Sequence, residues 1–275
     1  MTIAEALKKY QDIEADLLLS HILNKTKEFL HMHPEKKLTE VQRKKFILFA
    51  NYRRHGIPIA YLVGYKYFYG LKFKVTRDTL IPRPESEWLV EKAVGIIEAK
   101  LKKPRKEKLK VLDMATGSGC IIVSVAKQKY TNPVQFFAAD VSEKALSIAK
   151  SNSRTHKTKI KFIKSDLFSK IDDEFDLIIA NLPYVPISDY KKLKANLKYE
   201  PKLAITDGTD TFKLLKKFLD EAQNYLKPGG VLIIEVDPKF FKAVDGKHWR
   251  VVRDYKKLNR YALMNGSALK QKLRK

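Results

Sequence analysis

The chain has 275 residues, of which 44% are hydrophobic and 31% charged, so it is predicted to be a globular protein with two domains. No apolar run approaches the roughly 20 residues that a membrane-spanning helix needs, and the N-terminal residues do not have the pattern of a secretory signal. The single cysteine, Cys120, excludes an intramolecular disulfide framework. We therefore expect a cytoplasmic protein with no membrane contact, in which Cys120 is a small buried core residue.

The formal net charge of +24 favours acidic partners, namely nucleic acid, the ribosome or an acidic protein. Lysines occur in every segment and do not form one stripe, so the charge is equally consistent with a composition spread over all solvated faces. Charge alone therefore does not choose the substrate.

Residues 1–60 are predicted to form a helical domain. Thr39 and Gln42 have the spacing of a capping box, so a helix is expected to start at Thr39. The residues expected on its buried side are Val41, Phe46, Phe49 and Ala50. His31 and His33 are expected in a surface loop, because no third ligand has a suitable spacing, and the sequence predicts no metal site.

Residues 61–85 are predicted to form a β-hairpin that links the two domains, because polar and apolar residues alternate after Gly70. Pro82 and Pro84 fix φ in the segment that follows, so a stiff turn without helix is expected there. A helix is expected next, over residues 86–101.

Residues 86–275 are predicted to form the second domain, in which strands alternate with helices. Strands are expected near residues 109–113, 134–139, 160–163, 176–180, 230–236, 249–253 and 260–264, and helices near 119–130, 143–154 and 210–226. This alternation predicts an α/β fold with an open, mostly parallel sheet and helices on both faces. A ligand is then expected at the carboxyl ends of the strands.

A glycine turn follows the first of these strands and consists of Ala115, Thr116, Gly117, Ser118 and Gly119. Glycines let a backbone turn sharply and approach a ligand closely, although nicotinamide enzymes carry such a turn too. The third glycine of the dinucleotide fingerprint is missing here. The pattern therefore favours a compact adenosyl ligand over a pyrophosphate.

Two further strand ends carry candidate cofactor-binding residues. An acid at the position of Asp140 is placed to bind both hydroxyls of a ribose, and the alternative role of helix N-cap is better filled by Ser142. Asp166 could accept a hydrogen bond from an adenine amino group. Leu167 or Phe168 could cover the adenine ring, and core packing is an equally good role for Phe168.

The most informative turn is Asn181-Leu182-Pro183-Tyr184, which follows the apolar run 177–180. The Asn181 side-chain oxygen and the Leu182 carbonyl are candidate acceptors for the two N–H bonds of an amide or amino nitrogen. Tyr184 could stack on that planar group. Because such a nitrogen is a poor nucleophile, positioning has to supply the catalysis. Together with the glycine turn, this arrangement predicts methyl transfer to nitrogen, and the alternative is a purely structural Asn-Pro turn.

Six segments, spread over nearly the whole chain, carry a family resemblance. They are Ala15 to Leu19, Arg53 to Gly64, Phe73 to Glu87 with its Ile81-Pro82-Arg83-Pro84-Glu85 core, Thr116 to Cys120, Tyr199 to Ala204, and Leu226 to Gly230. With these segments the chain resembles the HemK family, the peptide chain release factor glutamine methyltransferases. The Ile-Pro-Arg-Pro-Glu segment is specific to this family, whereas many methyltransferases share the glycine turn.

The resemblance implies a Rossmann-like, class I S-adenosylmethionine-dependent methyltransferase domain, with a small N-terminal helical domain that helps to bind the release factor. The activity it implies is methylation of the side-chain amide nitrogen of the glutamine in the Gly-Gly-Gln motif of release factors, by a monomer. In the family an Asn-Pro-Pro-Tyr turn grips that glutamine. Asn181, Pro183 and Tyr184 match this turn, Leu182 replaces a proline, and Ala115 replaces the glycine that begins the cofactor turn.

The sequence Asn-Leu-Pro-Tyr also resembles the turn of ribosomal RNA adenine dimethyltransferases, so methylation of RNA amino groups is the alternative activity. Those enzymes usually carry their extra helical domain after the methyltransferase core and lack the Ile-Pro-Arg-Pro-Glu segment. A third alternative is a ribosome- or RNA-binding protein with a decayed site. The intact Asn181, Tyr184 and Asp140 argue against decay.

Overall fold

The structure, a computed structural model, describes residues 1–193, 195–243, 250–254 and 257–265. It divides into two compact units, the first made of Met1–Tyr65 with the short segment 195–199. The second unit contains Lys66–Leu193 and the described residues from Glu200 onward. Each unit has its own buried core.

The first unit is helical, as predicted. Its elements are α1 (Ile3–Lys9), α2 (Ala15–Leu23), α3 (Lys27–Met32), α4 (Glu40–Arg54), α5 (Ile59–Val63) and the 3₁₀ turn η2 (Ala195–Tyr199). The predicted capping box is present at the start of α4, because Thr39 Oγ1 accepts from the Gln42 N–H and Gln42 Oε1 accepts from the Thr39 N–H. Caps of this kind stabilise a helix by about 1 kcal/mol.

Two expectations in this unit were wrong. Val41 is 77% exposed, while Phe46 and Ala50 of the same helix are fully buried. Five residues separate Val41 from Phe46, which at 3.6 residues per turn places Val41 off the buried face. His31 lies in the last turn of helix α3, which ends at Met32, and does not lie in a loop.

The hairpin consists of β1 (Tyr65–Phe68) and β2 (Leu71–Lys74), with Gly70 at φ +71° in the turn. Helix α5 occupies the first residues of the range where only hairpin was expected. Strand β2 is held to the second unit by Asn152 of α8, whose side chain accepts from the Lys74 N–H and donates to the Lys74 carbonyl. The hairpin therefore packs as part of the second unit.

The turn after the hairpin contains a short helix that was not expected. Pro84 begins the 3₁₀ helix η1 (Pro84–Ser86), which leads into α6 (Glu87–Leu101). Proline is tolerated at the first position of a helix, because the N–H that it lacks has no partner inside the helix.

The second unit is built on a seven-stranded sheet in the order β5-β4-β3-β6-β7-β9-β8. The strands are β3 (Leu109–Met114), β4 (Val134–Asp140), β5 (Ile160–Lys164), β6 (Phe175–Asn181), β7 (Leu226–Glu235), β8 (Arg250–Arg253) and β9 (Asn259–Asn265). The first five strands in this order are parallel, and β9 runs antiparallel to both of its neighbours. All seven predicted strands are present, so the predicted open, mostly parallel sheet is confirmed.

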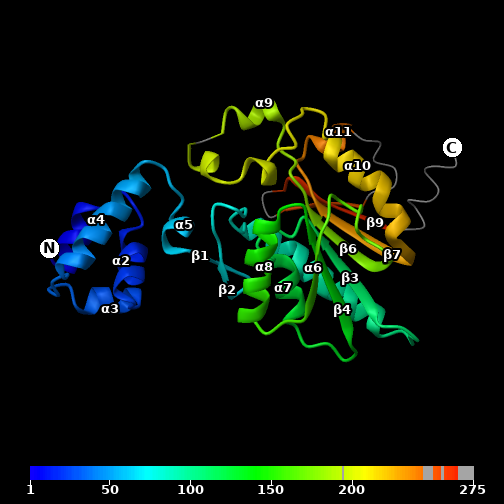
Figure 1. The fold of residues 1–275 in the computed structure, drawn as a ribbon, viewed down its shortest axis with the longest axis horizontal. Coiled ribbons are helices and arrows are strands. Elements are labelled where there is room, and N and C mark those ends of the chain that lie inside the picture. The colour runs from blue at the N-terminus through cyan, green and yellow to red at the C-terminus, as the bar shows by residue number, and fades with distance from the viewer. Residues whose placement is uncertain (194, 244–249, 255–256, 266–275) are drawn as a thin grey trace. The chain divides into compact units, whose positions relative to one another are not determined.

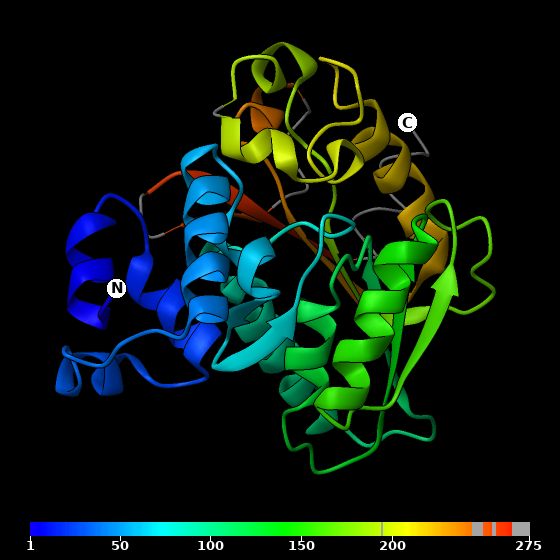
Figure 2. The same cartoon turned by 60° about the vertical axis from the view of Figure 1, so that its left-hand side comes forward.

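Helices cover both faces of this sheet (Figures 1 and 2). Side chains of α6 and α7 (Cys120–Ala126) pack on one face against Val111, Leu177 and Ile233, and α8 (Glu143–Thr155) lies beside α7. Side chains of α10 (Lys213–Ala222) pack on the other face against Leu112 and Ile178. Neighbouring strand residues thus serve opposite faces, which is the period of two expected of a sheet.

Candidate functional site

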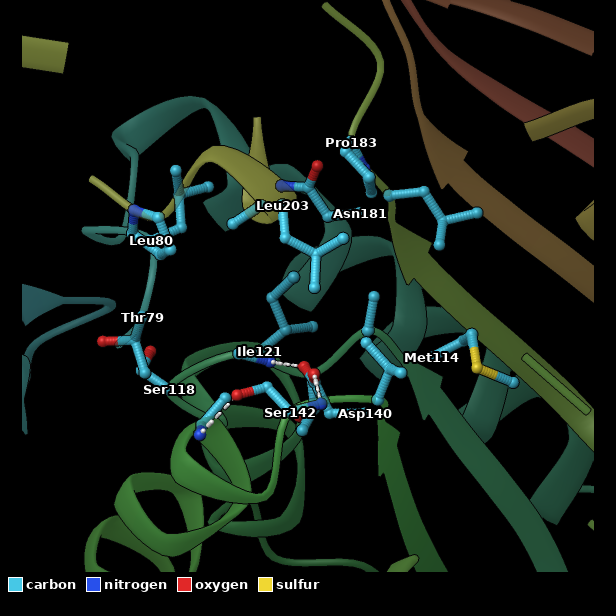
Figure 3. A pocket seen from close by; sticks show the side chains of 18 of the residues that line it. Thr79, Leu80, Met114, Ser118, Ile121, Asp140, Ser142, Asn181, Pro183 and Leu203 are labelled. Carbon is cyan, nitrogen blue, oxygen red and sulfur yellow. Dashed lines mark hydrogen bonds between the residues drawn. The ribbon is translucent and has the colours of Figure 1, made fainter. Parts of the chain in front are cut away.

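A cavity of about 390 Å³ opens at the carboxyl ends of β3, β4 and β6, the edge where the alternating pattern predicts a ligand. The predicted site residues that line it are Ala115, Thr116, Gly117, Ser118, Asp140, Asp166, Leu167, Asn181, Leu182 and Pro183. Figure 3 shows Asn181 and Pro183 above the cavity and Asp140 with Ser142 below it. Gly119, Phe168 and Tyr184, which were also predicted, do not line it.

The glycine turn is held in shape by hydrogen bonds inside the second unit. Thr116 Oγ1 donates to the Asp113 carboxylate at 2.6 Å, and the Gly117 N–H donates to Asp140 Oδ2 at 2.9 Å. Burial raises the pKa of Asp113 to about 7. Ala115 and Gly117 both have φ near +57°, so the alanine occupies a left-handed conformation that glycine adopts without strain.

Gly119 acts through packing and does not touch the cavity. Its φ is +77°, and a Cβ added to it would lie 3.0 Å from the Ala149 Cβ of α8. Cys120, the next residue, is buried as predicted, and burial raises the pKa of its thiol to about 12. A thiol with so high a pKa is protonated near neutrality and is no nucleophile.

Asp140 ends β4 and faces the cavity. Its Oδ2 accepts from the Gly117 N–H and its Oδ1 from the Ser142 N–H, both at 2.9 Å. Burial raises the pKa of this carboxyl. Ser142 caps α8 by accepting from the Ala145 N–H, which leaves Asp140 free of that role.

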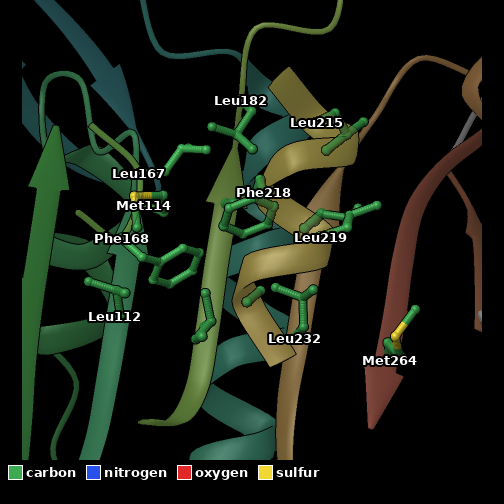
Figure 4. Packing of buried hydrophobic residues seen from close by; sticks show 14 of the residues in the cluster. Leu112, Met114, Leu167, Phe168, Leu182, Leu215, Phe218, Leu219, Leu232 and Met264 are labelled. Carbon is green, nitrogen blue, oxygen red and sulfur yellow. The ribbon is translucent and has the colours of Figure 1, made fainter. Parts of the chain in front are cut away.

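The loop after β5 divides its predicted residues between the cavity and the core. Asp166 and Leu167 line the cavity, whereas Phe168 is 2% exposed and stacks on Tyr225 and Phe218. Figure 4 shows Phe168 between the sheet and α10, facing Phe218. Of the two roles weighed for Phe168, the structure favours core packing, because its ring has no access to the cavity.

Asn181 ends β6 with its side-chain amide in a defined orientation. Its Nδ2 donates to Ser86 Oγ and to Glu235 Oε2, both at 3.1 Å. Its Oδ1 accepts no hydrogen bond from the part of the chain that the structure describes. Leu182 is 3% exposed and packs in the same core as Leu215 of α10 (Figure 4).

Tyr184 does not extend into the cavity as its predicted stacking role requires. Its hydroxyl donates to Glu235 Oε1 at 3.0 Å, and burial together with the charge of Glu235 raises its pKa well above 10. Glu235, which receives both Tyr184 and Asn181, was not among the predicted site residues. The sequence did carry a signal for Glu235, because this carboxylate directly follows the apolar run 231–234. The same pattern identified Asp140.

The segment Ile81-Pro82-Arg83-Pro84-Glu85 lies against the segment that begins at Glu200. Glu200 is 4% exposed, and it accepts from the Ile81 N–H and from the Arg83 guanidinium. Pro82 and Arg83 from the first segment, the adjoining Ser86, and Leu203 from the second segment line the cavity. Two motifs far apart in sequence thus form one wall of it.

Among the residues that the structure describes, no group of three or more His, Cys, Asp or Glu side chains is arranged to hold a metal ion. None of their helices combines the length and the apolar character that crossing a bilayer requires.

Solved structures similar to this chain support its fold. The hMettl16 catalytic domain in complex with MAT2A 3′UTR hairpin 6 has a TM-score of 0.53 at 13% identity, with 82% of each chain covered. A methyltransferase from Pyrococcus furiosus has a TM-score of 0.50 at 17% identity, covering 79% of this chain and 99% of that one. These two structures, the strand order of the sheet and a match to a methyltransferase domain model confirm the predicted Rossmann-like class I methyltransferase fold.

Two family models match the chain, a PrmC N-terminal domain over residues 3–64 and a methyltransferase domain over residues 105–273. Similar proteins named release factor glutamine methyltransferase occur in Koribacter versatilis (34% identity, 90% of this chain and 89% of the relative) and Haemophilus influenzae (31%, 91% and 90%). The one from Shewanella oneidensis is 35% identical over 81% of this chain and 76% of its own length. At these identities over most of both lengths, the chain belongs to the family of release factor glutamine methyltransferases.

Proposed function

We propose that this protein transfers a methyl group from S-adenosylmethionine to the side-chain amide nitrogen of the glutamine in the Gly-Gly-Gln motif of peptide chain release factors. The observation that carries the proposal is the orientation of Asn181 at the cavity, with its Nδ2 engaged and its Oδ1 left to accept. The names of the relatives support this substrate. They do not favour the alternative, methylation of ribosomal RNA.

The cavity fits S-adenosylmethionine in size and in chemistry. Its volume of about 390 Å³ lies in the range of small-molecule sites. Each Asp140 oxygen already accepts one N–H and has a further lone pair, which suits two ribose hydroxyls. Thr116 to Ser118 would cradle the methionine part, with Gly119 giving the turn its close packing, and Asp166 and Leu167 would bind the adenine. The bound cofactor supplies an electrophilic methyl group.

The protein contributes positioning to the transfer. The Asn181 Oδ1 and the Leu182 backbone carbonyl would accept the two N–H bonds of the glutamine amide, which turns the nitrogen lone pair toward the methyl group. Transfer would form the N–C bond at the expense of the S–C bond of the cofactor, and one amide proton would leave to solvent. Pro183 stiffens the turn. Tyr184 would brace the turn through the hydrogen bond from its hydroxyl to Glu235.

We further propose that the protein acts as a monomer in the cytoplasm. Residues 1–60 would serve as a helical domain for binding the release factor, residues 61–85 as the hairpin linker and residues 86–275 as the catalytic domain. Support comes from the PrmC N-terminal domain match over residues 3–64.

The decisive experiment is transfer of a labelled methyl group from S-adenosylmethionine. The acceptors are a purified release factor, the same factor with its loop glutamine replaced by alanine, and naked ribosomal RNA. Label on the intact factor alone supports the proposal. Label on the RNA alone would overturn it and make the basic charge of the chain the better guide to its substrate.

A ribosome or RNA contact has one specific feature in its favour. A second groove, over β4, β5 and α8, is lined by Lys108, Lys150, Arg154, Lys159 and Lys161, and none of the described residues that line it is acidic. We propose this groove as the place where the basic surface would meet RNA. Binding of ribosomal RNA should weaken steeply as salt rises, and the double variant Lys159→Glu, Lys161→Glu should remove much of that binding. Unchanged binding would reject the groove as the contact.

A further inference from the structure

Glu235 lies at the centre of the hydrogen bonds around Asn181. It ends β7 directly opposite Asn181 in the parallel register and is 2% exposed. Its Oε2 accepts from Ser86 Oγ at 2.7 Å and from Asn181 Nδ2 at 3.1 Å, and its Oε1 accepts from the Tyr184 hydroxyl at 3.0 Å. One carboxylate thus joins the Pro84–Ser86 turn to both ends of the Asn181–Tyr184 turn.

An ionised carboxylate can only accept hydrogen bonds, and this determines which way the Asn181 amide points. With Nδ2 toward Glu235, the amide donates to the carboxylate and to Ser86 Oγ. With the amide turned over, Oδ1 would face Oε2 and two acceptors would meet without a proton between them. The carboxylate therefore keeps Oδ1 on the opposite side from Glu235, available to a ligand.

Burial of the Glu235 carboxylate at this position is unfavourable for the stability of the fold. Burial raises its pKa, and the charged groups that act on it are Arg260 of β9, which favours the ionised form, and Glu85, which opposes it. Its three hydrogen-bond donors, from Ser86, Asn181 and Tyr184, are all neutral. Burying a charge without a directly bonded cation is unfavourable for folding. Such a carboxylate beside a cavity is more often found at functional sites than elsewhere.

We infer that Glu235 is a positioning residue for methyl transfer, which acts by fixing the Asn181 amide with Oδ1 toward the target nitrogen. The inference rests on the proposed function, because it assigns Glu235 a part in binding the substrate amide. Glu235 contacts neither substrate nor cofactor in this role. Its influence should therefore appear in turnover and pass through Asn181.

The test is Glu235→Gln, which keeps the size of the side chain and removes its charge. A glutamine can accept from Nδ2 or donate to Oδ1, so both orientations of the Asn181 amide become available. We expect kcat to fall by about 10- to 100-fold, the scale of a misplaced polar group, with little change in the Kd for S-adenosylmethionine. An unchanged kcat would overturn the inference.

A double-mutant cycle separates positioning from a general structural role. If Glu235 acts through Asn181, Glu235→Gln should lower kcat far less in an Asn181→Ala background than in the wild type. Independent, multiplying effects would contradict the inference. The matched control is Asp176→Asn, at the opposite end of β6, where a buried carboxylate binds Arg105 and the Lys110 N–H. It should lower stability and leave kcat near the wild-type value.

Two safeguards keep the outcome interpretable. If Glu235→Gln does not fold, Glu235→Asp retains the charge but draws it back by one methylene, and kcat should again fall, whereas a wild-type kcat would count against the inference. A wild type that does not methylate the release factor at all would reject the proposed function. A wild type that does so, with active Glu235 variants, would reject only the role of Glu235.

Discussion

Asp140 receives two backbone N–H groups, and its remaining lone pairs face the cavity. We expect Asp140→Asn to weaken binding of S-adenosylmethionine by roughly 1.5–3 kcal/mol, the range for hydrogen bonds to a charged group. Calorimetric titration measures the change. Asp176→Asn removes a buried carboxylate away from the cavity and should leave the affinity as it is. Equal affinities for wild type and Asp140→Asn would refute ribose binding by Asp140.

Ala115 has a backbone conformation that favours glycine. Its φ of +57° is strained for any residue with a Cβ. We expect Ala115→Gly to raise the free energy of unfolding by about 0.5–1 kcal/mol, as relief of strain exceeds the entropy that glycine adds to the unfolded chain. Denaturant unfolding checks this. The control, Ala126→Gly at the last residue of α7, should lower the free energy of unfolding, because glycine is the poorer helix former.

Among the elements, the start of α7 depends on close contact with α8. A Cβ at Gly119 would lie 3.0 Å from the Ala149 Cβ, and the φ of +77° is strained for alanine as well. We expect Gly119→Ala to destabilise the fold by about 2–4 kcal/mol, from overpacking and strain together. Gly95→Ala in α6 is the matched control, because a Cβ there meets nothing within 4 Å. That variant should be about 0.5–1 kcal/mol more stable than the wild type, as alanine is the better helix former. If Gly119→Ala had the wild-type free energy of unfolding, α7 and α8 would be able to move apart enough to accept the added Cβ.

The elements also show how far the sequence could predict the structure. Apolar runs such as 177–180 predict the central strands of the sheet, because a parallel strand buried on both faces has few other compositions. The start of β7 was placed at residue 230 and lies at Leu226, since Pro228-Gly229-Gly230 has the composition of a turn. The glycine turn, Asp140 and Asn181 could be found as strand-end motifs. Glu235 was missed, because its link to Asn181 depends on the register between strands, which local pattern does not reveal.

For the whole molecule, buried carboxyls set the response of stability to pH. The pKa of Asp113 is raised from 3.8 to about 7, and the pKa values of Asp140 and Glu235 are raised as well. Between about pH 4 and 7 the folded state therefore holds a proton on Asp113 that the unfolded chain has lost. This contribution to stability is complete below about pH 4 and is lost as the pH rises through 7.

We accordingly expect the Tm of the protein without ligand to decrease as the pH is raised from about 5 to 8. The variant Asp113→Asn should decrease less over the same range, because its amide does not titrate. Calorimetric scans of both proteins at fixed ionic strength make the comparison. If the Tm of the wild type and the Tm of Asp113→Asn changed with pH in the same way, the pKa of Asp113 would not be raised in the folded state.

The raised pKa of Asp140 also couples protons to whichever ligand occupies the cavity. Hydrogen bonds from ribose hydroxyls and a nearby positive sulfonium would both favour the ionised form of Asp140 and oppose the effect of burial, which raises its pKa. S-adenosylhomocysteine has a neutral sulfur and offers the same carboxylate less electrostatic support. Acidification should therefore weaken the binding of both forms of the cofactor, and it should weaken the binding of S-adenosylmethionine more than that of S-adenosylhomocysteine.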